Sequence, residues 1–361
     1  MATYKSIRYL VPDEVVEHTD SINALADVNT STVAPEIGQT LKWSAANSRW
    51  QPADIEESGF SASQKGMFGF GDSYPGGRTN ETNRVSSTGV VASAGQSAGT
   101  ARSDVAASGY GNGKAIFGFG RSSSSNAVNM TNLVSTAGVI ASDTTGIGTA
   151  RYGLAAAGFG GDKAIFGFGY ENQNITNLVS NAGVVATDTT GVGTGRKGLA
   201  GASYGGDKAL FGFGAATGSD GTNVTNLVSN AGVVSTDTTG VGQARYGLTA
   251  AGYGEDKAIF GFGFYNDGGS FGVTSRTNLV SNLGVVATDT TGVASSREMP
   301  AGIGYGGDKA IFGFGNYYED YQFVYTNVTN LVSNTGIVAT DTTGVGTARS
   351  YISAAGYSTT A

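Results

Sequence analysis

KAIFGFG, at Lys163–Gly169, is the stretch that decides the fold, because the chain carries it or a close variant six times. The copies begin at Lys65, Lys114, Lys163, Lys208, Lys257 and Lys309, so successive starts lie 45 to 52 residues apart. A period in this range indicates one supersecondary unit per repeat. Such a unit cannot bury its apolar faces alone, so we expect the repeats to stack in a solenoid or a ring.

Each repeat contains four short apolar runs separated by turn signals. Residues 151–196 contain, in order, YGLAAAGFG, GDK, AIFGFG, YENQNI, TNLVS, NAG, VVAT and DTTGVGTGR. Short runs rich in β-branched and aromatic residues, bounded by Gly, Asp and Asn, are typical of strands joined by tight turns. The frequent glycines disfavour a helix by about 1 kcal/mol per interior position. The sequence therefore predicts a four-stranded antiparallel meander in each repeat.

Bulky and absent side chains alternate along FGFG. Because successive residues of a strand point to opposite faces, we expect Phe166 and Phe168 on one face of the sheet and Ile165, Gly167 and Gly169 on the other. The rings of one sheet can then settle over the glycines of its neighbour, and each buried ring contributes about 2 kcal/mol. The Ala-rich run before FGFG suits the crowded innermost position. These features favour a closed ring over an open solenoid.

The two ends of the repeat region predict how the ring closes. Six FGFG strands are accompanied by seven segments that resemble the inner strand, and the first of these, SGFSAS at residues 58–63, is degenerate. The last, ARSYISAAGYS, can complete the first blade with residues near Ile352 to Tyr357. We therefore predict an all-β fold, a six-bladed β-propeller of four-stranded antiparallel blades that is closed by the C-terminal strand.

The composition excludes several classes of function. The 361 residues include 59 glycines, carry a formal net charge of −7, lack cysteine and contain one histidine, His18. This leaves no disulfide framework, no thiolate nucleophile, no cysteine or multi-histidine metal site and no Ser-His-Asp triad within the repeats. An acidic chain with dispersed Lys and Arg argues against nucleic-acid binding. We expect no cofactor, no metal and no enzymatic activity.

A change of texture near Ser58 divides the chain into an N-terminal arm, residues 1–57, and the repeat domain, residues 58–361. The first twenty residues show neither a secretory signal nor a membrane span, so we expect synthesis in the cytoplasm and no membrane insertion. Within the arm, TLKW and RWQP flank SAANS and predict a short hairpin with Trp43 and Trp50 as anchors for attachment to a partner. A simple ordered leader is the alternative.

The repeat units resemble two known groups of proteins. The order of hydrophobic strand, Gly-rich strand, TNLV, Gly-Val-Val and terminal Arg resembles the kelch-type β-propeller repeat across residues 58–361. Units such as KAIFGFG, TNLVSNAGVVATDTTGVGTGR and AAAGFGGDK are similar to repeat proteins of tailed bacteriophages, particularly marine ones. In the leader, LADVNTST and GQTLKWSAANSRWQPAD resemble attachment segments of phage tail fibres and other virion proteins.

This resemblance implies a structural protein on the outside of a virion, made in the host cytoplasm. Residues 1–57 would bind other virion proteins, and the propeller would be displayed in a tail fibre or another peripheral appendage for host attachment, as a homo-oligomer. Capsid decoration or a vertex role is an alternative, and so is a soluble glycan-binding lectin or a tail depolymerase. A propeller alone does not decide between these functions.

The repeats differ most between FGFG and TNLV, in loops that up-and-down geometry places on one face of the ring. Two of these loops combine aromatic rings with acidic acceptors that suit a sugar or protein partner. The candidate binding residues are Tyr265, Asp267, Tyr317, Tyr318, Glu319, Asp320, Tyr321, Phe323 and Tyr325. The alternative is that these rings pack on one another or on an adjacent subunit. For a depolymerase, Glu319 and Asp320 would be the candidate carboxylates.

Two recurrent residues invite metal or anion binding. The aspartates of Asp-Thr-Thr-Gly are Asp143, Asp188, Asp237, Asp289 and Asp341. One carboxylate per motif is too few oxygens for calcium, so we predict turns in which Asp accepts local backbone N–H bonds. The recurrent arginines are Arg102, Arg151, Arg196, Arg245, Arg297 and Arg349. They could line a channel. We predict instead that each arginine ties its connector, the segment that leads from one blade to the next, to a neighbouring blade through carbonyls or a carboxylate.

Overall fold

The computed structural model describes residues 39–44, 49–54 and 63–361 apart from 94, 172 and 219. The chain divides into two compact units, Met1–Glu57 and Ser58–Ala361. In the first unit, β1 (Gln39–Ser44) and β2 (Arg49–Asp54) form the predicted hairpin, with Trp43 opposite Trp50. The degenerate segment at Gly59 and Phe60 lies outside the described residues. Within the described ranges, the structure has no helix that could span a membrane.

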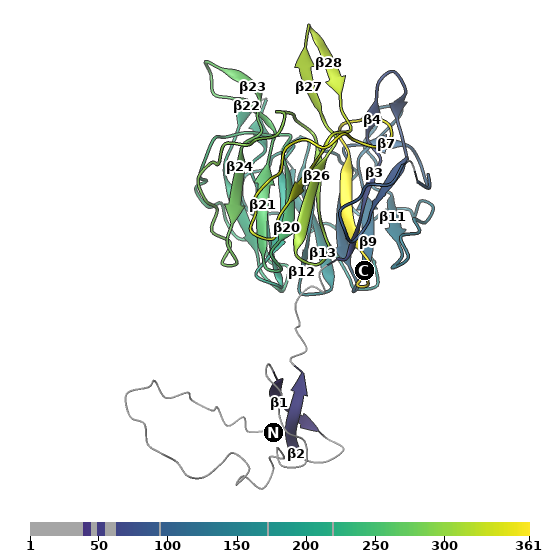
Figure 1. Cartoon of the computed structure of the whole chain (residues 1–361), viewed down its shortest axis with the longest axis vertical. Helices are drawn as coiled ribbons and strands as arrows, with labels where there is room; N and C mark the ends of the chain where they lie inside the picture. The colour runs from purple at the N-terminus through teal and green to yellow at the C-terminus, as the bar shows by residue number, and fades with distance from the viewer. Residues whose placement is uncertain (1–38, 45–48, 55–62, 94, 172, 219) are drawn as a thin grey trace. The chain divides into compact units, whose positions relative to one another are not determined.

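Over its described residues, the repeat region forms six three-stranded antiparallel sheets (Figure 1). The inner strands are β8 (Ala106–Tyr110), β12 (Ala155–Phe159), β15 (Ala200–Tyr204), β20 (Thr249–Tyr253), β25 (Ala301–Tyr305) and β30 (Ser353–Tyr357). The middle strands, which carry KAIFGFG, are β3 (Lys65–Gly69), β9 (Lys114–Gly118), β13 (Lys163–Gly169), β16 (Lys208–Gly212), β21 (Lys257–Gly261) and β26 (Lys309–Gly313). The third strands, which carry TNLV or TNRV, are β6 (Thr82–Val85), β11 (Thr131–Val134), β14 (Gln173–Val179), β19 (Thr225–Val228), β24 (Thr277–Val280) and β29 (Thr329–Val332).

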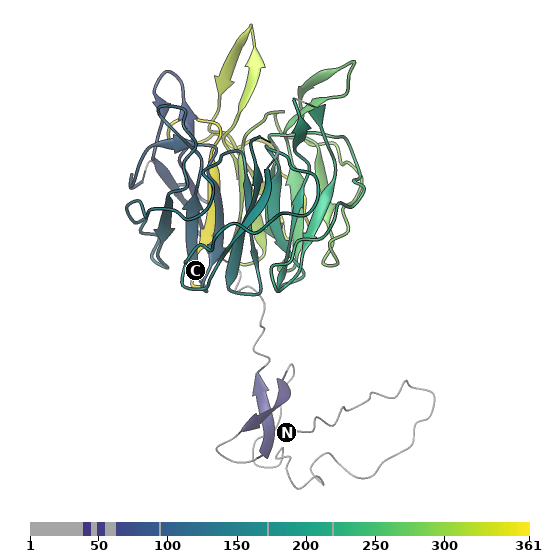
Figure 2. The same cartoon turned by 180° about the vertical axis from the view of Figure 1, so that it is seen from behind.

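Shorter strands lie at one end of these sheets. They are β4 (Asp72–Ser73), β5 (Gly77–Arg78), β7 (Arg102–Ser103), β10 (Arg121–Ser122), β17 (Ala215–Thr217), β18 (Asp220–Gly221), β22 (Phe264–Asn266), β23 (Phe271–Val273), β27 (Asn316–Glu319) and β28 (Gln322–Tyr325). Figures 1 and 2 show the hairpins β22–β23 and β27–β28 projecting beyond the same end of the sheets.

The fourth segment of each repeat is not the regular strand that the sequence predicted. In the third repeat it is held to β14 by two isolated bridges, Val179 to Val185 and Thr176 to Thr189. These two bridges differ in register by one residue, so a continuous ladder cannot form between them. Each sheet therefore has three regular strands and a loosely paired outer segment.

The two phenylalanines of FGFG point to opposite faces of the sheet, so the predicted alternation is wrong at the second one. Phe168 has a left-handed backbone, with φ of 65°, and the register of β13 and β14 shifts between Gly167 and Gly169. This bulge turns the Phe168 side chain toward the next sheet, where its ring meets Phe211 edge-on at 5.3 Å. Phe166 packs on Phe119 of the preceding sheet, with ring centroids 5.1 Å apart.

The predicted nesting of rings over glycines is confirmed. The Phe166 ring covers Gly118 of the preceding sheet, where a Cβ would lie 2.8 Å from Phe166 Cζ. The same contact joins Phe211 to Gly167. All six of these first phenylalanines are fully buried: Phe68, Phe117, Phe166, Phe211, Phe260 and Phe312. The sheets are thus joined face to face by an aromatic ring that fills the space left by a missing side chain.

The recurrent arginines are buried between sheets. Arg196 Nε donates to Phe213 O at 2.6 Å and its Nη2 donates to Asn226 Oδ1 at 2.7 Å, both in the sheet that its connector enters. Its guanidinium lies 4.4 Å from the centre of the Phe168 ring, in the preceding sheet. Burial lowers the pKa of Arg196 to about 10, against the attraction of Asp237. The prediction that the arginines tie connectors to a neighbouring blade is confirmed.

The Asp-Thr-Thr-Gly aspartates do not make the local turns that the sequence predicted. Asp237 Oδ2 accepts the backbone N–H of Thr194 at 3.0 Å and its hydroxyl at 2.6 Å. Thr194 lies 43 residues earlier, in the connector that enters the same sheet. Gly193 allows this approach, because a Cβ there would lie 2.3 Å from Asp237 Oδ1. The carboxylate therefore anchors a distant connector, and the described residues contain no group of three or more potential metal-ligating side chains.

The last strand of the chain, β30, completes the first sheet. The C-terminal strand β30 pairs with β3, with Met67 opposite Ala355 and Phe68 opposite Ala354. Phe68 also packs against Phe314, the residue that follows β26 in another sheet, with ring centroids 5.1 Å apart. Neighbouring inner strands contact one another in the order β8, β12, β15, β20, β25 and β30, and β30 also contacts β8.

Candidate functional site

The variable loops and the connectors meet at the end of the sheets where the hairpins project. The residue that follows each connector arginine lies beside the residue that follows FGFG in the same sheet. For example, Lys197 N–H donates to Ala215 O at 3.0 Å, and Ala215 N–H donates to Lys197 O at 2.8 Å. The other pairs are Ser350 with Asp72, Ser103 with Arg121, Tyr152 with Tyr170, Tyr246 with Phe264 and Glu298 with Asn316.

Hairpin β27–β28 carries most of the predicted binding residues. A two-residue turn, Asp320–Tyr321, joins its strands, and both residues have left-handed backbones. Tyr318 and Phe323 face each other across the strands, with ring centroids 5.3 Å apart. Tyr318 is 58% exposed, Phe323 57% and Tyr321 92%. These three rings, which we call the hairpin cluster, form an exposed aromatic surface on a regular backbone.

The remaining predicted residues of this hairpin have other surroundings. Tyr317 and Tyr325 are half-buried near its base, and burial raises the pKa of Tyr325. Glu319 pairs with Gln322 next to the turn. Asp320 lies in the turn itself and is exposed. The structure therefore places these residues on one hairpin and separates the exposed rings from the rings at its base.

Tyr265 and Asp267 lie on a different hairpin, β22–β23. Asp267 Oδ1 accepts the backbone N–H of Ser270 at 2.9 Å, which closes the turn. Tyr265 is half-buried, and its hydroxyl lies 3.5 Å from Ser270 Oγ. Asp267 thus has a structural role within its turn. Trp43 and Trp50 belong to the other unit, on paired strands of its hairpin.

A second feature of this end, a pocket of about 410 Å³, was missed by sequence reasoning. It is bordered by the connectors, and we give the name collar to six of its residues, one from each connector. The collar residues are Asp104, Gly153, Gly198, Gly247, Met299 and Tyr351, all with φ between 52° and 64°. Backbone hydrogen bonds link neighbours in the collar: Gly198 N–H donates to Gly153 O, and Asp104 N–H donates to Tyr351 O.

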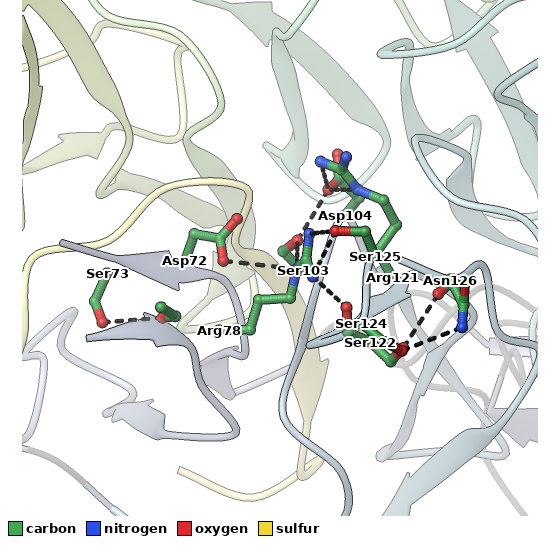
Figure 3. Close-up of polar contacts among 11 residues, drawn as sticks. Asp72, Ser73, Arg78, Ser103, Asp104, Arg121, Ser122, Ser124, Ser125 and Asn126 are labelled. Atoms are coloured by element: carbon green, nitrogen blue, oxygen red, sulfur yellow. Dashed lines mark hydrogen bonds and ion pairs between the residues drawn. The ribbon is translucent and has the colours of Figure 1, made fainter. Parts of the chain in front are cut away.

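One wall of this collar pocket is a stack of cations and rings. Arg121 lies over Tyr152, Tyr152 stacks on Tyr170 at 4.5 Å and 18°, and Lys197 Nζ lies 4.8 Å from the centre of the Tyr170 ring. Figure 3 shows the Arg121 side chain directed toward Asp104. Arg121 Nη2 donates a hydrogen bond to Asp104 Oδ2 at 2.7 Å. Burial raises the pKa of Asp104, and Arg121 opposes the rise. The pocket thus combines stacked rings, a partly buried ion pair and a second cation.

The signal for the collar pocket lay in two short variable positions. The dipeptide after each connector arginine reads Ser-Asp, Tyr-Gly, Lys-Gly, Tyr-Gly, Glu-Met or Ser-Tyr. The residue after FGFG is equally variable, and it supplies Arg121 and Tyr170. Variation limited to positions that flank fixed residues is expected where a rigid scaffold carries a binding surface.

Comparisons with known proteins address the fold. No protein-family model matches the chain, and no curated protein matches it. Among solved structures, that of YjhT matches with a TM-score of 0.54 and 12% sequence identity, over 72% of this chain and 90% of YjhT. The chain has a β-propeller-like fold. At this identity the likeness shows the fold alone, so the function of the propeller-like unit rests on its own residues.

Proposed function

We propose that residues 58–361 form a closed six-bladed, kelch-like propeller that is the binding head of a phage virion surface protein. The ladder between β30 and β3 supports closure, as do the contacts between successive inner strands. The phage origin rests on the resemblance of the repeat units and the leader, and residues 1–57 are assigned to attachment on the same grounds. In this proposal the head acts in host attachment, in a tail fibre or a similar appendage.

The single observation that carries the proposed function is the hairpin cluster. The tip tyrosine is 92% exposed and belongs to the same hairpin as two more exposed rings, and a group of exposed apolar side chains marks an interaction site. Aromatic rings with hydroxyl groups contact both the apolar faces of sugars and protein surfaces. The regular hairpin holds these rings in place before binding, which reduces the entropy lost on association.

Binding without catalysis fits the acidic residues near the collar pocket. Asp104 is held by Arg121 and by the Ser103 hydroxyl at 3.0 Å. Glu298 is buried and accepts a hydrogen bond from Asn316 Nδ2 at 3.3 Å, and burial raises its pKa. Each carboxyl group therefore already has a partner within the fold. We propose that the protein is not an enzyme.

The test measures binding of the full chain to a panel of bacterial cells and to an array of bacterial surface polysaccharides. Tyr318→Ala with Tyr321→Ala should weaken binding at least tenfold while the melting temperature is kept. Tyr74→Ala is the matched control, because Tyr74 is 79% exposed in the corresponding loop of the first repeat. Unchanged binding by the double variant would contradict the proposal. Unchanged binding together with a change of oligomeric state in sedimentation would instead assign the hairpin cluster to a subunit interface.

A further inference from the structure

We propose that the collar pocket binds a single sugar residue that carries a carboxylate. This site is separate from the hairpin cluster and uses different residues, so the inference goes beyond the proposed attachment role. It depends on the size of the pocket, on the chemistry of its walls and on one cation that has no carboxylate partner.

The size and lining of the pocket suit one sugar ring. A volume of about 410 Å³ lies within the range of small-molecule sites. Apolar side chains from successive connectors, Leu154, Leu199 and Leu248, lie beside the tyrosines in its lining. A sugar presents apolar C–H faces and a rim of hydroxyl groups, and this lining offers a partner for each. A purely apolar ligand would displace water from the ion pair of Asp104 and Arg121 without replacing the hydrogen bonds of that water.

The charged residues that line the pocket, Asp104, Arg121 and Lys197, are one anion and two cations, and this balance favours an anionic ligand. Arg121 is neutralised by Asp104, as described above. Lys197, at the other end of the same stack, forms no ion pair with any carboxylate of the described residues. Four lysines of the repeats, Lys163, Lys208, Lys257 and Lys309, each pair with the preceding aspartate at 2.5 to 2.9 Å. Lys65 and Lys114, like Lys197, form no ion pair among the described residues, but neither of them lines this pocket. A carboxylate on the ligand would give Lys197 the partner that it lacks.

Three of the six collar residues are not glycine, although the left-handed backbone at these positions favours glycine. Gly153, Gly198 and Gly247 occupy the collar in three repeats, but Asp104, Met299 and Tyr351 stand at the same left-handed positions in the others. Residues with side chains are disfavoured in this conformation. Local strain of this kind concentrates at ligand sites, where the side chain has a use. Asp104, Met299 and Tyr351 all border the pocket.

The experiment compares glucuronate with glucose by isothermal titration calorimetry on the full chain. The two sugars differ only in a carboxylate against a hydroxymethyl group. Glucuronate should bind about tenfold more tightly than glucose, as expected for one charge-assisted hydrogen bond. Lys197→Gln should remove this difference, and Lys197→Arg should restore most of it. Lys163→Gln is the matched control, because Lys163 begins β13 at the other end of its sheet and its replacement should leave both affinities unchanged.

Several outcomes would overturn the proposal. Saturable binding of neither sugar would do so, and so would equal affinities of the wild type and Lys197→Gln for glucuronate. Acetate binding as tight as glucuronate binding would show a simple anion site. An oligosaccharide that ends in glucuronate distinguishes the two sources of the same ligand: tighter binding than glucuronate assigns a polysaccharide end, and equal binding assigns the single residue. Glucuronate binding that survives Tyr318→Ala with Tyr321→Ala separates this site from the hairpin cluster.

Discussion

Gly212 lies against the ring of Phe260 so closely that a Cβ on the glycine would be 2.6 Å from Phe260 Cζ. The contact crosses from one sheet to the next and recurs around the repeats with small differences. At the corresponding position of the next sheet, Gly261, a Cβ would be 3.4 Å from the Phe312 ring, an ordinary van der Waals contact. The same substitution is thus expected to have different effects at two equivalent sites.

Gly212→Ala should destabilise the protein by about 1 to 3 kcal/mol, because the added methyl group forces the buried Phe260 ring to move. Gly261→Ala is the matched control and should change the free energy of unfolding by no more than about 0.5 kcal/mol. Urea denaturation of the two variants measures the difference. Equal losses at both sites would show that the ring does not fill the space above the glycine.

Arg245→Met should destabilise the fold by about 2 to 5 kcal/mol, because it removes the donors to two buried acceptors. Arg245 is fully buried, its Nε donates to Phe262 O at 2.8 Å, and its Nη2 donates to Asn278 Oδ1 at 2.6 Å. Arg276→Gln, in the same sheet but with a 44% exposed side chain, should change stability by no more than about 1 kcal/mol. Thermal unfolding of both variants provides the comparison, and similar melting temperatures would contradict the structural role of Arg245.

Acid should weaken the anchoring of the connectors. Burial raises the pKa of Asp237, but hydrogen bonds from Thr194 and Asn226 outweigh this effect and lower it overall. The pKa of Asp188 is lowered in the same way, by Thr149 and Asn177. A carboxylate whose pKa is lower in the folded state stabilises the fold above its unfolded pKa, about 3.9, and loses this contribution as the pH falls through its folded pKa.

Urea midpoints measured from pH 6 down to pH 2 should therefore fall most steeply below about pH 4. Asp237→Asn should be less stable at pH 6, and its midpoint should depend less on pH than that of the wild type. A variant whose midpoint follows the same pH curve as the wild type would show that Asp237 does not contribute through its charge.

The sequence was sufficient to predict features that depend on a regular strand. The strand positions, the ring over Gly118 and the pairing of β3 with residues 353–357 all follow from periodicity and from counting repeated segments. The orientation of Phe168 could not be predicted, because phenylalanine rarely adopts a left-handed backbone. Its conformation is explained by partners that only the fold brings together. Phe168 O accepts a hydrogen bond from Arg151 Nε at 2.8 Å, and the Phe168 ring contacts the guanidinium of Arg196.

The candidate site was predictable only in part. The aromatic loop at residues 316–325 was recognisable because it holds four tyrosines, whereas the same loop of each other repeat holds at most one. The collar pocket was not, because each of its residues is one variable position beside a fixed one. Asp104 and Arg121 are 17 residues apart and become an ion pair only when the connector and the loop meet at one sheet end. Asp237 and Thr194 meet in the same way.

Closure of the ring is the central claim, because the common face and the collar pocket both require it. The most direct measurement is thermal unfolding of the chain ending at Ile352, which lacks β30, beside a control that lacks only the exposed residues 359–361. The account predicts that the control melts like the full chain. The chain without β30 should melt at least about 10 °C lower or without a cooperative transition, since β3 and Phe68 lose their partners. Equal melting temperatures for all three proteins would contradict closure by the C-terminal strand.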